Sequence, residues 1–120
     1  MFNENEIENY KYKPDEALEA LGLDDELLHQ LLLDYVEQVI KSVSVFLDYI
    51  SKLESGENVD FTPLKDLAHK NLGVARNLHV KDAEFYLSEL MHNEDLTYLR
   101  SCVKKLSYSS IKLKYMLTGS

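Results

Sequence analysis

The sequence predicts an all-α protein, an antiparallel up-down four-helix bundle with a short extra N-terminal helix. Apolar residues recur at steps of three and four over long stretches, and no stretch alternates apolar and polar residues as a half-buried strand does. The 120 residues contain only four glycines and two prolines. The expected connections between helices are short, which favours antiparallel neighbours.

The extra helix is expected over residues 14–22. Pro14 suits a first helical turn, and Gly22 suits a helix end. Residues 1–13 are polar and lack a clear period, so we expect a flexible N-terminal tail there and a bundle domain over residues 14–118. Two tyrosines of this tail are candidates for packing onto the bundle: Tyr10 and Tyr12.

The first long helix is predicted from an N-cap at Asp24 to about Glu54. One face of this stretch is apolar at helical spacing throughout. Its expected buried residues are Leu28, Leu32, Tyr35, Val39, Val43, Phe46, Ile50 and Leu53. A helix of that length spans about 45 Å.

Three further helices are predicted over residues 62–79, 81–92 and 96–117. Asp60 or Thr62 is expected to cap the first of them. The candidates for the buried side of the second are Phe85, Leu87, Leu90 and Met91. The apolar repeat of the last consists of Leu96, Leu99, Val103, Leu106, Ser110, Leu113 and Leu117.

Composition limits the function classes. The formal net charge is −8, so nucleic acid is not an expected partner, because phosphate binding needs clustered cations. No stretch approaches the ~18 apolar residues of a membrane span. The single cysteine, Cys102, leaves no internal disulfide and is expected in the core. We therefore expect a soluble, cytoplasmic protein, or a cytoplasmic piece of a longer one. We also expect it to be a monomer.

The stretch around His69 combines an apolar face with an isolated imidazole. Its apolar residues project roughly 160° to 260° away from the histidine: Leu64, Leu67, Ala68, Ala75 and Leu78. Lys65 and Arg76 project within about 40° of His69 on one side, and Thr62 and Gly73 on the other. Glycine costs about 1 kcal/mol in a helix. Either another helix packs closely at Gly73, or a large partner must approach the imidazole.

The other candidate residues favour structural interpretations. His29 and His92 are expected on the surface, and His79 at a helix end. The four histidines show no spacing typical of a metal site, so no metal is expected. Tyr35 and Tyr49 are expected to pack in the bundle and not to stack on bases.

Two stretches resemble a known family. Residues 21–28, LGLDDELL, with residues 31–35, LLLDY, are similar to the entry into the first long helix of histidine-containing phosphotransfer (HPt) domains of bacterial phosphorelays. Residues 66–69, DLAH, with later small and polar positions, resemble the histidine motif of that family. These later positions are Gly73, Ala75, Asn77 and Leu78. The resemblance covers about residues 15–117.

Three positions depart from that motif. Leu72 stands where the family has lysine, Asn71 where it has leucine, and His79 where it has glycine. The lysine is expected to lie beside the phosphoryl group, so its loss matters most. On the helical projection, Lys65 and Arg76 share the face of His69 and are candidate replacements.

The resemblance implies a phosphorelay intermediate. His69 would accept a phosphoryl group from a receiver-domain aspartate on Nε2 and pass it to another receiver. The phosphate-stabilising or partner-facing residues would be Lys65, Arg76, Gly73, Thr62 and Lys70. Of these, Lys70 projects about 100° from His69 and is the weaker candidate.

The implied partners are response-regulator receiver domains and a hybrid histidine kinase. By the same resemblance, Mg²⁺ would belong to the receiver, so the chain itself would need no cofactor and would be a phosphocarrier and not a turnover enzyme. Two alternatives stay open. One is a degenerate HPt-like bundle that binds receivers or kinases without carrying phosphate, and the other is a general helical adaptor.

Overall fold

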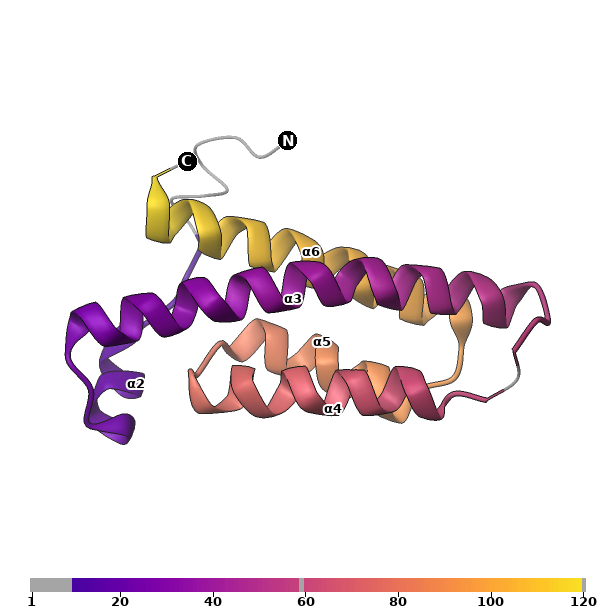
Figure 1. Cartoon of the computed structure of the whole chain (residues 1–120), viewed down its shortest axis with the longest axis horizontal. Coiled ribbons are helices and arrows are strands. Elements are labelled where there is room, and N and C mark those ends of the chain that lie inside the picture. The colour runs from indigo at the N-terminus through magenta and orange to yellow at the C-terminus, as the bar shows by residue number, and fades with distance from the viewer. Residues whose placement is uncertain (1–9, 59, 120) are drawn as a thin grey trace.

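The computed structural model describes residues 10–58 and 60–119, and its described part is all-helical, as predicted (Figure 1). The expected tail residues 1–9 lie outside the described residues. The helices are α2 (Pro14–Leu21), α3 (Asp25–Glu54), α4 (Thr62–Asn77), α5 (Lys81–His92) and α6 (Leu96–Thr118). Each begins and ends within about two residues of its predicted bounds.

Local capping signals explain these bounds. The Asp24 carboxylate accepts a hydrogen bond from the backbone N–H of Leu27 at 2.8 Å, so it caps α3 as expected. Asp95 caps α6 in the same way through the N–H of Tyr98 at 3.1 Å. Gly22 follows α2 in the left-handed conformation, with φ of 66°, which glycine adopts at little cost.

The helices pack as neighbouring pairs. α3 lies along α6, and α4 lies along α5 (Figure 1). α5 also contacts α6, α3 contacts α4, and the short α2 contacts the start of α3. The interior between them is apolar. Its largest fully buried side chains are Phe46, Leu28, Ile50, Leu64, Leu87, Leu90, Leu99, Leu106 and Leu113.

The predicted apolar faces account for most of this core. Seven of the eight residues predicted to be buried on α3 are buried, and Val43 is half-buried. On α5 one expectation is wrong, because the Phe85 side chain is 57% exposed. The buried face of α5 follows Ala83, Leu87 and Leu90, and Phe85 projects about 160° away from Leu87 on that helix.

The segment before α2 packs onto the body. Tyr12 donates a hydrogen bond from its hydroxyl to the backbone carbonyl of Leu78 at 2.7 Å. Burial raises the pKa of Tyr12 to about 12. Tyr10 is also half-buried against the core, beside Asp82. Residues 10–13 are therefore held against the end of α4, which fits the packing considered for these two tyrosines.

Candidate functional site

His69 lies near the middle of α4, and its side chain is exposed. The opposite face of α4 is directed into the core, as the helical projection predicts. The buried residues of this helix are Leu64, Ala68, Asn71, Leu72 and Ala75. A hydrophobic face fixes the rotation of a helix, so burying these residues holds the imidazole on the solvent side.

Lys65 lies one turn before His69 but its ammonium group is engaged elsewhere. Its Nζ forms an ion pair with Glu94 Oε2 at 2.7 Å, in the connection between α5 and α6. The same Nζ lies 5.9 Å from the centre of the Phe61 ring, within cation–π range. The structure therefore places Lys65 on the predicted face and gives it a carboxylate partner that the sequence did not indicate.

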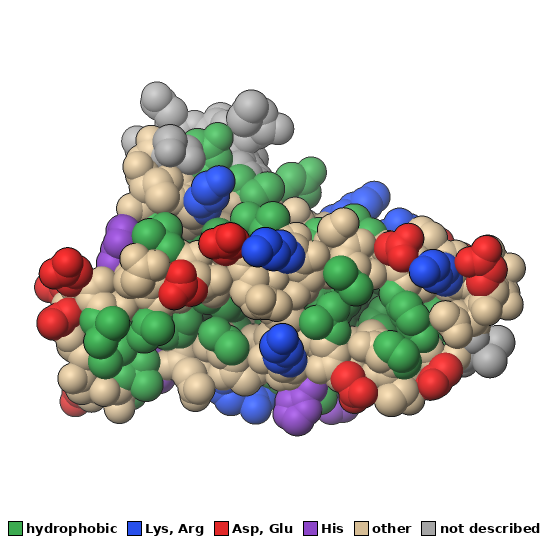
Figure 2. Space-filling model, viewed as in Figure 1, with side chains coloured by type: hydrophobic (Ala, Val, Ile, Leu, Met, Phe, Trp, Pro, Cys, Tyr) green, Lys and Arg blue, Asp and Glu red, His purple; other side chains and the backbone are tan. Residues whose placement is uncertain are grey.

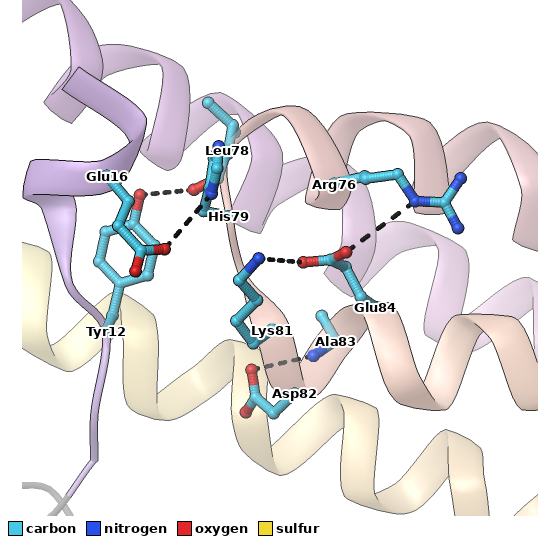
Figure 3. A network of polar contacts seen from close by, with 9 residues as sticks. All are labelled: Tyr12, Glu16, Arg76, Leu78, His79, Lys81, Asp82, Ala83 and Glu84. Atoms are coloured by element: carbon cyan, nitrogen blue, oxygen red, sulfur yellow. Dashed lines mark hydrogen bonds and ion pairs between the residues drawn. The ribbon is translucent and has the colours of Figure 1, made fainter. Parts of the chain in front are cut away.

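Arg76 lies two turns after His69 and faces α5. Its Nε is 3.9 Å from Glu84 Oε1, and Lys81 Nζ is 3.8 Å from the other oxygen of the same carboxylate (Figure 3). In the described part of the chain, no hydrogen bond or ion pair joins His69 to either Lys65 or Arg76. Glu84 and Glu94 are the residues that sequence reasoning missed, because neither lies at a helical spacing from His69.

Gly73 is exposed one turn after His69. Apart from the backbone of its own helix, a Cβ added there would meet no described heavy atom within 4 Å. Close packing of another helix of this chain therefore does not explain the glycine. The absence of a side chain leaves the helix backbone accessible beside the imidazole. The exposed Thr62 and Lys70 complete the set of predicted site residues on α4.

Gly73→Ala is expected to raise the free energy of unfolding by about 0.5–1 kcal/mol, because alanine has the higher helix propensity and the site has room. Urea denaturation measures it. Gly22→Ala is the matched control. Its surroundings are equally open, but its φ of 66° strains any side chain, so it should destabilise. A destabilised Gly73→Ala protein would show that a close contact exists at this position.

The position where the HPt motif has lysine is buried. Leu72 is 3% exposed, and the neighbouring Asn71 is 1% exposed. Asn71 Nδ2 donates hydrogen bonds to Ser42 Oγ on α3 at 3.0 Å and to the Leu67 carbonyl at 2.9 Å. Asn71 therefore links α4 to α3 by a buried polar contact, and Leu72 supplies apolar packing beside it.

Apolar side chains are also exposed on α3 and α4. Figure 2 shows them on the face where α3 and α4 meet. On α3, Leu27, Leu31 and Val45 share one side of the helix and are 36–54% exposed. On α4, Val74 is 39% exposed.

The remaining predicted residues are placed as follows. His29 and His92 are exposed, as expected, and Cys102 is buried. His79 follows α4 with φ of 60°, the helix-end conformation that usually takes glycine.

Among the residues that the structure describes, no group of three or more histidine, cysteine or acidic side chains is arranged to hold a metal ion. Within the same residues, no helix is long and apolar enough to cross a membrane.

Comparison of the chain with protein-family models, curated proteins and solved structures found no match. The described residues therefore define a structural class only: they are arranged as an all-helical protein in which α4 presents His69 to solvent, one turn before the open Gly73.

Proposed function

We propose that this protein is a phosphorelay intermediate of the HPt type, a cytoplasmic phosphocarrier built as an antiparallel up-down four-helix bundle. The observation that carries the proposal is the exposure of His69 in the middle of α4, with an open backbone at Gly73 one turn away. The resemblance of the motif around His69 to the HPt histidine motif supports the same function.

The chemistry requires little from this chain. The unprotonated ring nitrogen of a neutral imidazole attacks the phosphorus of a receiver's aspartyl phosphate. A P–N bond forms as the P–O bond to the aspartate breaks, and the receiver carboxylate leaves with that electron pair. Phosphoryl transfer depends mainly on positioning and charge neutralisation. The Mg²⁺ of the receiver, with Lys65 and Arg76, supplies the positive charge in this proposal.

The partner would dock over the α4 face. Val74 supplies exposed apolar contact area on the same helix as His69, and Lys70 adds a cation to it. The partners in this proposal are response-regulator receiver domains and the receiver of a hybrid histidine kinase. Gly73 lets the receiver surface reach the helix backbone beside the phosphoryl group.

The test is phosphorylation of the full chain. Incubation with a phosphorylated receiver domain, and separately with phosphoramidate, should give one acid-labile, base-stable phosphoryl group on His69, located by mass spectrometry. Binding of a receiver domain with no phosphorylation by either donor would contradict the phosphocarrier proposal. It would support the alternative, a degenerate bundle that binds receivers without carrying phosphate. Two observations favour this second candidate: Leu72 is buried where a lysine is expected, and Lys65 is paired with Glu94.

Glu94→Gln is expected to speed phosphorylation of His69 by about two- to fivefold, because it frees the Lys65 ammonium group to approach the phosphoryl oxygens. The magnitude follows from the value of exposed ion pairs, about 0.5–1 kcal/mol. Initial rates of transfer from a phosphorylated receiver measure it. Glu37→Gln, which breaks the exposed Lys41–Glu37 pair on α3, is the matched control. A slower Glu94→Gln protein would show that the pair positions the site and does not restrain it.

A further inference from the structure

A small cavity of about 240 Å³ lies where the segment before α2 meets the connection between α4 and α5. It is separate from the exposed face of His69. Its lining residues are Lys11, Tyr12, Lys13, Glu16, His79 and Lys81. Drug-sized ligands occupy pockets of about 300–1,000 Å³, so this cavity suits a smaller molecule.

The lining is cationic in an acidic protein. Three lysines and one acidic residue, Glu16, line the cavity, whereas the whole chain carries a net charge of −8. Glu16 is turned toward His79, with its Oε2 3.5 Å from the imidazole Nδ1 (Figure 3). Within residues 10–58 and 60–119, neither Lys11 nor Lys13 forms an ion pair. Among the residues that the structure describes, Glu16 is therefore the one acidic residue of the lining, and it faces His79.

The cavity is held together by contacts between distant parts of the chain. The hydrogen bond from Tyr12 to the Leu78 carbonyl fixes the segment between the two lysines, Lys11 and Lys13, against the end of α4 (Figure 3). The turn at His79 then places Lys81 as the first residue of α5, on the opposite wall. Lysines 68 and 70 positions apart in the chain thus line one small volume.

Lys81 is only loosely held by its own partner. Its Nζ lies 3.8 Å from Glu84 Oε2, and Arg76 lies 3.9 Å from the other oxygen of that carboxylate. An anion in the cavity can therefore draw the Lys81 ammonium group without leaving Glu84 unpaired.

We infer that this cavity binds a small anion bearing a phosphate group, either inorganic phosphate or the phosphate of a small phosphate monoester. Lys11 and Lys13 form no ion pair within residues 10–58 and 60–119, and Lys81 shares Glu84 with Arg76, so the lining keeps a net positive charge that suits a phosphate anion. Lysine ammonium groups bind phosphate oxygens as point charges. The inference does not depend on phosphorylation of His69, which lies outside the cavity lining.

The experiment is an NMR titration of the full chain at constant ionic strength, with inorganic phosphate, with glycerol phosphate and with chloride. Saturable shifts of the His79 and Lys81 amide signals are expected with both phosphates, at a Kd of about 1 mM or tighter. Tighter binding of glycerol phosphate identifies an esterified ligand, and equal or weaker binding identifies the free anion. Shifts that do not saturate, or that chloride reproduces, overturn the site.

Variants separate this site from general charge effects. The triple variant Lys11→Ala/Lys13→Ala/Lys81→Ala is expected to weaken phosphate binding at least tenfold. The control removes Lys41 and Lys52, which are exposed on α3 and paired with Glu37 and Asp48, and it should bind as the wild type does. Equal affinity in the triple variant contradicts the inference. His69→Gln should bind phosphate normally, so failure of the phosphocarrier proposal and failure of this one are distinguishable.

Discussion

Replacing His69 by glutamine is expected to abolish phosphorylation of the protein and to leave its fold and stability intact. Glutamine has no ring nitrogen that can form a phosphoramidate, so the loss should be complete for both a phosphorylated receiver and phosphoramidate. His69 is exposed on α4, and no hydrogen bond to its side chain is seen among the described residues. Exposed substitutions of this kind usually change stability by less than about 0.5 kcal/mol. Phosphate incorporation and urea denaturation measure the two effects.

His29→Gln is the matched control for this variant. His29 is also exposed on a long helix, α3, but it lies outside the α4 face. It should be phosphorylated at the wild-type rate. A His69→Gln protein that still takes up acid-labile phosphate would contradict the proposed acceptor, and loss of labelling in His29→Gln as well would show that the effect is not specific to His69.

The helices could be predicted from the sequence because their signals are local. Asp24 and Asp95 accept hydrogen bonds from N–H groups only three residues away, and Gly22 ends α2 through its own φ. The apolar repeats of α3 and α6 are long enough to fix the phase of each helix. The apolar pattern of the 12-residue α5 is too short to fix which face of that helix is buried. The prediction that Phe85 lies in the core is therefore wrong.

The site could be predicted only in part, because periodicity within one helix says nothing about contacts between helices. Helical periodicity placed His69 and Gly73 on the solvent face of α4, where the structure has them. The partners of the site cations could not be found this way. Glu94 lies 29 residues from Lys65 in the chain and reaches it only because α5 folds back along α4. Tertiary packing, and not spacing, therefore decides how much free positive charge surrounds the imidazole.

Leu72→Lys, which restores the lysine of the HPt motif, is expected to destabilise the protein by about 2–4 kcal/mol. Leu72 is 3% exposed and packs in the core with Asn71 at its side. The substitution loses the burial of a leucine side chain, worth about 2–3 kcal/mol. It also places an ammonium group at a buried position, and only the flexibility of the lysine stem, which can reach toward solvent, limits the cost. Urea denaturation against the wild type measures the change.

Leu72→Met is the control, since it keeps the apolar volume and should cost less than about 1.5 kcal/mol. Phosphorylation rates of the folded fraction of Leu72→Lys then show whether a lysine at position 72 can assist transfer to His69. Leu72 projects about 60° from His69 on α4, so a lysine there reaches the imidazole only by leaving the core. If Leu72→Lys is as stable as the wild type and is phosphorylated faster, the position is accessible and the loss of lysine is a loss of function. If it is unstable and no faster, core packing explains the leucine at this position, and the proposed positive charge is left to Lys65 and Arg76.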